Sequence, residues 1–124
     1  MSPSAPQPRL IFLSGDLVFA SRVRGACEEA GYDFHFGANL PAPADPEAAQ
    51  AVPFVVLDLA TRSGLTQTLV AEARKNYPQA RLIAYAPHVH KGKLQAAAEA
   101  GFDEVLTRGQ FDRWLTQPTL WKAG

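Results

Sequence analysis

The sequence predicts a doubly wound α/β domain of three layers, in which a five-stranded parallel sheet lies between two layers of helices. Two observations predict this fold. Short, continuous apolar runs such as residues 53–59 lack the polar alternation of half-exposed strands, and they are typical of parallel strands buried on both faces. Segments with apolar residues at helical spacing alternate with these runs, and the connections between them are short. The 124 residues suffice for one such domain with a core that needs neither disulfides nor metal.

The first half of the chain supplies three of the predicted strands. Residues 9–13 form the first apolar run. Asp16 is placed to cap the helix that follows, because its carboxylate can accept hydrogen bonds from free backbone amides. Residues 32–36 alternate in polarity, which favours a strand nearer the edge of the sheet. A proline-containing loop and a short helix over 46–51 lead to the central strand, which carries Asp58 at its carboxyl end.

The second half of the chain continues the alternation of helix and strand. Its predicted elements are a turn at Thr61, Ser63 and Gly64, a helix over 65–77, a strand over 81–86, a helix over 94–101, a strand over 104–107 and a short helix over 111–115. Gly31 and Gly101 each follow the dipeptide Glu-Ala and are predicted to end their helices in the left-handed conformation.

Composition and missing motifs narrow the function. The 12 basic and 12 acidic residues balance, so no overall field attracts nucleic acid or an anionic membrane. The chain shows no signal peptide and no apolar run of membrane-spanning length, and we expect a cytoplasmic protein. Dinucleotide, P-loop and hydrolase-elbow motifs are absent, and we expect no enzyme activity. Cys27 lies in a helical pattern and is predicted to be buried.

We predict a domain over 9–117, preceded by a flexible leader over 1–8 and followed by a tail over 118–124. Within this domain the pattern resembles the receiver domain of bacterial response regulators. Asp58 matches the phosphoacceptor aspartate of that family, and the alanine-rich segment 95–101 resembles its fourth helix. The resemblance implies the flavodoxin-like, CheY-like fold with strand order 2-1-3-4-5 and a role in signalling.

Five positions around Asp58 depart from the receiver pattern. The two acids that hold Mg²⁺ in receivers correspond to Ser14 and Gly15, and Asp16 comes one place too late. Ala86 stands where receivers have a threonine or serine, and Arg108 stands where they have a lysine. The resemblance therefore implies a degenerate pocket. A receiver of this type is a pseudo-receiver, which acts through protein contacts without Mg-dependent aspartyl phosphorylation.

Alternatives remain open for this pocket. We expect Arg108 to pair with Asp58 and to occupy the vacated space, with no cofactor. A relocated Mg²⁺ site formed by Asp16 and Asp58 would instead make the chain a working receiver phosphorylated on Asp58. A small-molecule sensor could use the same pocket. His88 and His90 could present two imidazoles to a metal, but such a site needs further ligands, and solvated loop histidines are the favoured interpretation.

The carboxyl end of the chain is rich in aromatic and apolar residues. Phe111, Trp114, Leu120 and Trp121 either close the core or form an interface, where tryptophan is favoured. The resemblance implies a possible homodimer through the fourth helix, the fifth strand and the fifth helix. The expected partner is a protein that the sequence does not identify, with no role for nucleic acid or membrane.

Overall fold

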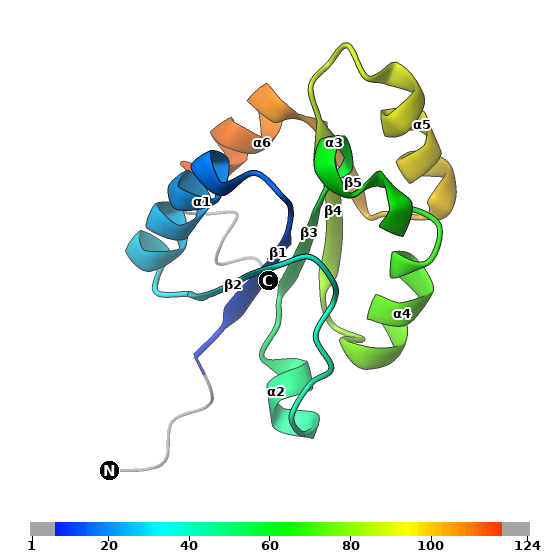
Figure 1. The fold of residues 1–124 in the computed structure, drawn as a ribbon. Helices are drawn as coiled ribbons and strands as arrows, with labels where there is room; N and C mark the ends of the chain where they lie inside the picture. Colours follow the sequence, from blue (N-terminus) through cyan, green and yellow to red (C-terminus); the bar gives the residue numbers. More distant parts are fainter. Residues whose placement is uncertain (1–6, 118–124) are drawn as a thin grey trace.

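The computed structural model describes residues 7–117 and contains one five-stranded parallel sheet in the order β2-β1-β3-β4-β5 (Figure 1). The strands are β1 (Arg9–Leu13), β2 (Asp33–Gly37), β3 (Phe54–Asp58), β4 (Arg81–Ala86) and β5 (Glu104–Thr107). The helices are α1 (Leu17–Ala30), α2 (Pro46–Gln50), α3 (Leu59–Arg62), α4 (Leu69–Asn76), α5 (Lys91–Ala100) and α6 (Arg108–Leu115), with a 3₁₀ turn at Ser63–Leu65. The predicted fold class and strand order are confirmed.

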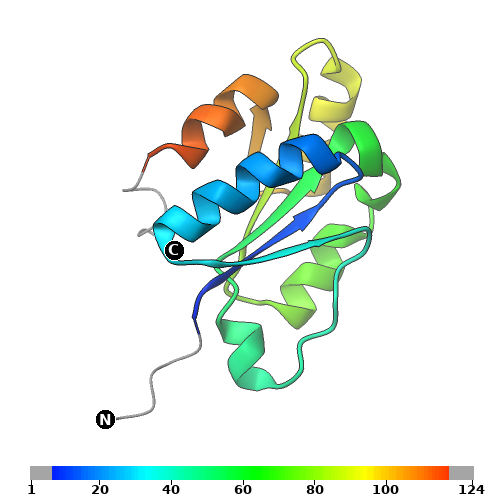
Figure 2. The same ribbon diagram turned by 60° about the vertical axis from the view of Figure 1, so that its left-hand side comes forward.

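Helices cover both faces of the sheet, and each face has its own apolar core (Figure 2). Side chains of α1 and α6 pack on one face, where Phe12, Phe54 and Phe111 are buried, and we call this core the α1/α6 cluster. Side chains of α3, α4 and α5 pack on the opposite face, and we call that core the α4/α5 cluster. All five residues of β3 are buried, as expected for the central strand of a covered parallel sheet.

Four predicted helix boundaries are confirmed. Asp16 caps α1, because its carboxylate accepts a hydrogen bond from the Phe19 amide at 2.9 Å. Asp45 caps α2 in the same way. Gly31 and Gly101 end α1 and α5 with φ angles of 80° and 103°, in the left-handed region that glycine adopts without strain.

The turn expected at Thr61, Ser63 and Gly64 is present only in part, as the 3₁₀ turn Ser63–Leu65. Helix α3 begins at Leu59, directly after β3, and Thr61 lies within it. The physical reason is that Asp58 caps this helix itself by accepting a hydrogen bond from the Ala60 amide at 3.0 Å. The helix expected over 65–77 is correspondingly shorter and begins at Leu69.

Helix α6 also begins earlier than predicted. Thr107 and Gln110 form a capping box, in which each side chain accepts a hydrogen bond from the backbone amide of the other residue, so the helix begins at Arg108 rather than at Phe111. This places Arg108 in the first turn of a helix, at the carboxyl end of β5.

The described termini lie against the domain. Gln7 donates a hydrogen bond to the Gly31 carbonyl, and the Pro8 carbonyl accepts one from the Asp33 amide at the start of β2. The rest of the predicted leader, residues 1–6, and the predicted tail, residues 118–124, lie outside the described residues. None of the helices in the described range is long and apolar enough to cross a membrane.

Candidate functional site

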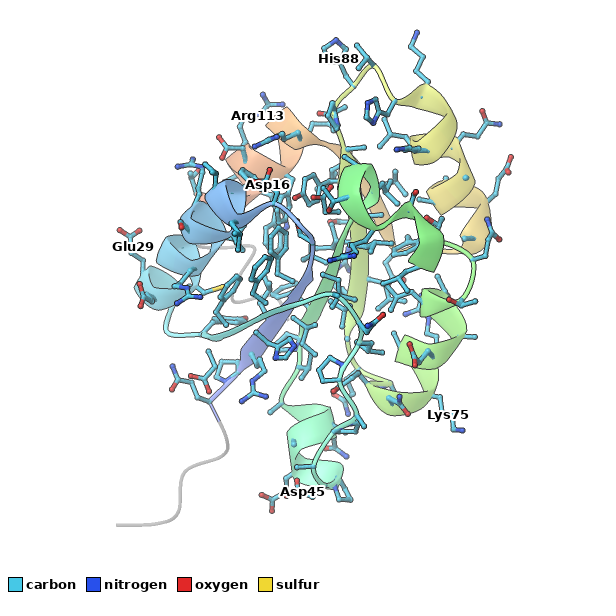
Figure 3. The ribbon with its side chains drawn as sticks, viewed as in Figure 1. Asp16, Glu29, Asp45, Lys75, His88 and Arg113 are labelled. Carbon is cyan, nitrogen blue, oxygen red and sulfur yellow. The ribbon has the colours of Figure 1, made fainter. Side chains whose placement is uncertain are left out.

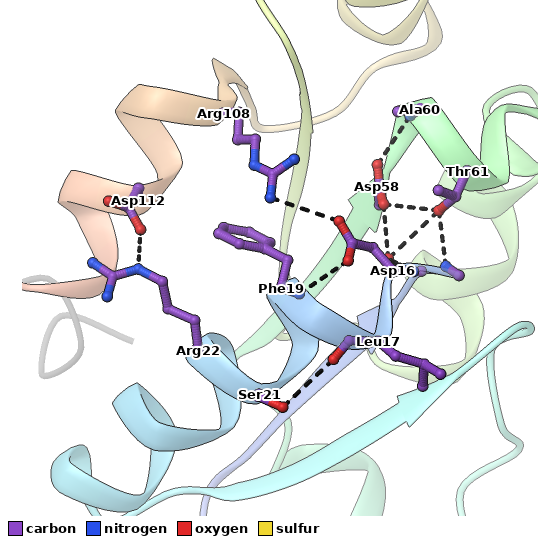
Figure 4. Close-up of polar contacts among 12 residues, drawn as sticks. Asp16, Leu17, Phe19, Ser21, Arg22, Asp58, Ala60, Thr61, Arg108 and Asp112 are labelled. Carbon is purple, nitrogen blue, oxygen red and sulfur yellow. Dashed lines mark hydrogen bonds and ion pairs between the residues drawn. The ribbon is translucent and has the colours of Figure 1, made fainter.

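Asp58 lies buried at the carboxyl end of β3 and accepts three hydrogen bonds (Figure 4). The hydroxyls of Ser14 and Thr61 each donate to Oδ2 at 2.7 Å. The Ala60 amide donates to Oδ1 at 3.0 Å. The side chain is only 3% exposed, so these bonds replace most of the hydration that a carboxylate needs.

The two hydroxyls that bind Asp58 also tie two loops together. Ser14 lies in the loop after β1, and its Oγ accepts a hydrogen bond from the Asp16 amide at 2.9 Å. Thr61 lies in α3, and its Oγ1 accepts one from the Gly15 amide at 2.8 Å. Each hydroxyl therefore donates to the carboxylate and accepts from the backbone of the β1–α1 loop. We call Ser14, Asp58 and Thr61 with these backbone partners the Asp58 network.

The expected ion pair between Arg108 and Asp58 is wrong. The Arg108 guanidinium lies 3.6 Å from Oδ2 of Asp16 and stacks over the Phe19 ring, 4.4 Å from its centroid (Figure 4). Three uncharged donors satisfy Asp58, so it needs no cation. Because the side chains of Arg108 and Asp16 are 47% and 27% exposed, their pair contributes at most about 1 kcal/mol.

Tyr85 is the residue of this site that the sequence interpretation missed. It pairs in register with Asp58 across β3 and β4, and it belongs to the α1/α6 cluster. Its hydroxyl is buried and makes no hydrogen bond of acceptable geometry with any described residue. Burial raises the pKa of Tyr85, and the negative charge of Asp58 raises it further. Its position beside Asp58 follows from the register of β3 and β4, because neighbours in register share a face of the sheet.

Replacing Tyr85 with phenylalanine should raise the free energy of unfolding by about 1 kcal/mol, because it removes a buried hydroxyl that has no partner. The gain should increase above about pH 10, where the phenol ionises in the unfolded chain but stays neutral in the folded one. Urea unfolding at neutral and alkaline pH measures both effects. The matched control is Tyr77→Phe, which should cost about 1 kcal/mol because that hydroxyl donates to the Pro41 carbonyl. Equal effects of the two substitutions would contradict the prediction.

The remaining candidate residues lie apart from the Asp58 network. Ala86 packs in the α4/α5 cluster on the opposite face of the sheet. His88 is exposed on the loop after β4, and His90 is half-buried. Within residues 7–117, no group of three or more histidine, cysteine, aspartate or glutamate side chains is arranged to hold a metal ion. Cys27 is buried, as predicted, and burial raises its pKa to about 12.

The aromatic residues of α6 are part of the core. Phe111 is fully buried and stacks on Tyr85 with ring centroids 4.7 Å apart, and Trp114 is 7% exposed. Of the two alternatives given for these residues, their burial corresponds to closure of the core, because they fill the space between α6 and the sheet. Leu120 and Trp121 lie outside the described residues.

Comparison with known proteins places the fold. No family model and no curated protein matches the chain. Among solved structures, a response regulator from Thermotoga maritima matches with a TM-score of 0.67 and 15% identity over 95% of this chain and 99% of that one. A response regulator from Burkholderia pseudomallei, solved with a phosphorylated aspartic acid and a calcium ion, has a TM-score of 0.64 and 21% identity over 94% of this chain and 70% of that one. The beryllofluoride-activated NtrC4 receiver domain dimer has a TM-score of 0.65 and 20% identity over 91% and 94%.

These matches show that the chain has the CheY-like fold of response regulator receiver domains. Sequence identities of 14% to 21% among them carry the fold and nothing finer. Whether Asp58 can be phosphorylated therefore depends on the residues that surround it in this chain.

Proposed function

We propose that this domain is a pseudo-receiver, which signals through protein contacts without Mg-dependent phosphorylation of Asp58. The observation that carries the proposal is the set of three hydrogen bonds that satisfies this buried carboxylate. Oδ2 accepts two of these bonds, so both of its lone pairs are engaged, and Oδ1 accepts the third. The three donors are neutral, so none of them would offset the negative charge of an approaching phosphoryl group.

The charges needed for phosphoryl transfer support the same proposal. The divalent ion of such sites neutralises charge on the transferred group and is held by carboxylates. Here Ser14 and Gly15 supply a hydroxyl and a backbone amide in the positions of the two acids. Asp16 caps α1 with one oxygen and faces Arg108 with the other, so using it as a metal ligand would cost both interactions.

The neighbouring strand ends lack the groups that would bind a phosphoryl group. Ala86 has no hydroxyl to donate, and Arg108 lies over Phe19 rather than beside Asp58. The two loops that a bridging cation could join are already joined by Ser14 and Thr61. We infer that the hydrogen-bond network joins the two loops as a bound metal ion would. It does not supply the positive charge that phosphoryl transfer needs.

Incubation with acetyl phosphate and Mg²⁺ tests the proposal. We expect the intact mass of the protein to be unchanged, while a receiver with both acids is modified under the same conditions. A second arm uses the Ser14→Asp, Gly15→Asp double variant, which restores the pair of acids. Stoichiometric addition of a phosphoryl group to the unsubstituted chain, abolished by Asp58→Asn, would overturn the proposal and make the chain a working receiver.

The surface through which this domain contacts a partner protein must consist of exposed residues. The face formed by α5, β5 and α6 was expected to supply it, and the NtrC4 receiver dimer shows that receiver domains can self-associate. Since Phe111 and Trp114 are buried, they do not contribute to such a face. Other exposed surfaces of the domain therefore have to be considered.

A further inference from the structure

Basic and acidic side chains are concentrated at opposite ends of the sheet. We define the carboxyl rim as the loops and first helical turns beyond the carboxyl ends of the strands, residues 14–20, 59–62, 87–94 and 108–111. Its basic residues are Arg62, Lys91, Lys93 and Arg108, with His88 and His90 beside them. Its one acidic residue is Asp16, and Asp58 is buried below. The rim therefore carries an excess of positive charge.

The opposite end of the sheet has the reverse balance. Acidic residues predominate in the last helical turns and in the segments that enter the strands, and these are Glu28, Glu29, Asp33, Asp45, Glu47, Glu99, Asp103 and Glu104. Figure 3 shows His88 at one end of the molecule and Asp45 at the other. A domain with no net charge therefore has two ends of opposite sign.

The cations of the carboxyl rim are largely unpaired. At the acidic end, Arg74 and Arg81 form ion pairs with Asp103 and Glu104. On the rim, only Arg108 has a carboxylate within ion-pair distance among residues 7–117, and that pair is long, at 3.6 Å. The rim thus offers positive charge that the described part of the chain leaves without a partner.

Exposed apolar side chains lie on the same rim. Within residues 7–117 the large apolar side chains that are exposed are Leu17, Val18 and Val89, which are 72%, 84% and 67% exposed. The first two belong to the first turn of α1, and Val89 belongs to the loop between β4 and α5. Exposed apolar groups bordered by charged ones are typical of contact surfaces.

A groove lies on the same rim. It is lined by Phe19 and Arg22 of α1, by Pro87 and His88 of the β4–α5 loop, and by Arg108 and Asp112 of α6. Asp112 already forms an ion pair with Arg22. The Arg108 side chain crosses this groove above the Phe19 ring (Figure 4). The groove therefore combines an aromatic floor with a guanidinium that can bind a carboxylate through two donors.

We propose that the carboxyl rim is the docking surface for an acidic amphipathic segment of a partner protein. Apolar side chains of that segment pack against Val18 and Val89, and its carboxylates pair with Arg108 and Lys91. The proposal rests on the proposed function, since it names the surface and the chemistry of the protein contact. Helices α5 and α6, which begin at this rim and have no acidic residue in their first turns, add partial positive charge to it.

Nucleic acid fits this surface less well than an acidic protein. Asp16 lies within the rim beside Arg108, and a phosphate backbone approaching the groove would meet it. Phe19, the aromatic side chain of the groove, is buried and covered by Arg108, so no ring is presented for base stacking. A segment with separate carboxylates can place them beside the basic residues of the rim and away from Asp16.

A titration of the isotope-labelled full chain tests the proposal. The probe is a helical peptide of about 15 residues with glutamate on one face and leucine on the other. It is added without Mg²⁺ or phosphodonor, at about 0.01 M salt, where the Debye length is about 30 Å. We expect amide shifts confined to the carboxyl rim, and binding that weakens as salt is added. The lysine version of the peptide and single-stranded oligothymidine are the comparison probes.

Charge reversal at matched positions provides the control. Lys91→Glu lies on the carboxyl rim and Lys75→Glu at the acidic end, and both side chains are exposed. We expect the first to weaken peptide binding by about fivefold and the second to leave it unchanged. Equal effects, no binding, shifts away from the rim, or tighter binding of oligothymidine would each overturn the docking proposal. None of these outcomes bears on acetyl phosphate labelling, so the two proposals fail separately.

Discussion

Replacing Asp58 with alanine should lower the free energy of unfolding by about 3 kcal/mol. The substitution leaves the buried Ser14 hydroxyl without its acceptor, and it removes the acceptor of the Thr61 hydroxyl and the Ala60 amide, which belong to exposed residues. The unsatisfied buried donor costs about 1–3 kcal/mol, and the two other lost hydrogen bonds add about 0.5–1.5 kcal/mol each. Loss of the carboxylate also weakens the link between the β1–α1 loop and α3. The carboxylate positions the two hydroxyls that accept hydrogen bonds from the backbone of that loop.

Urea unfolding followed by circular dichroism measures this change. Asp58→Asn is the first comparison, because it keeps one acceptor oxygen and should cost about half as much. Asp45→Ala is the matched control for simple capping. Asp45 also accepts an amide hydrogen bond at a helix start, but it is exposed, and its loss should cost about 1 kcal/mol.

The sign of the Asp58→Ala effect separates two roles of the carboxylate. A group kept for chemistry is commonly held at some cost to stability, so that its removal is neutral or stabilising. A group kept for structure stabilises the fold, and its removal is destabilising. An Asp58→Ala variant as stable as the unsubstituted chain would therefore contradict the structural role assigned to the Asp58 network and favour a phosphoacceptor.

Local patterns were sufficient to predict most of the fold. Continuous apolar runs marked the buried strands, and Asp16, Gly31 and Gly101 marked helix ends, because capping depends on residues close in the sequence. The strand order came from the resemblance to receivers and is confirmed by the sheet. Periodicity alone does not determine which strands become neighbours.

The errors arose where a side chain serves two elements at once. Asp58 ends β3 and caps α3, so Thr61 lies in a helix where a turn was expected. Arg108 was assigned to Asp58 by charge alone, whereas the Ser14 and Thr61 hydroxyls already satisfy that carboxylate. Tyr85 was missed because its proximity to Asp58 depends on the register of β3 and β4, which spacing within either strand does not give.

Phe111→Ala should be the other strongly destabilising substitution, with a loss of about 4 kcal/mol in the free energy of unfolding. Phe111 is fully buried, and its ring stacks on Tyr85 with ring centroids 4.7 Å apart and on Trp114 with centroids 5.7 Å apart. Truncation to alanine leaves a cavity between α6 and the sheet, and the stacked rings on either side lose their contacts. Guanidinium unfolding gives the midpoint and the slope from which this loss is calculated.

The matched control for Phe111→Ala is Val89→Ala. Val89 is 67% exposed on the carboxyl rim, so its truncation should change stability by no more than about 0.5 kcal/mol. Val89→Ala should weaken binding of the acidic peptide while leaving stability nearly unchanged, whereas the main effect of Phe111→Ala is the loss of stability. If Phe111→Ala left stability unchanged but altered sedimentation, the residue would belong to an interface between copies of the chain. The burial of its ring within a single chain predicts the opposite.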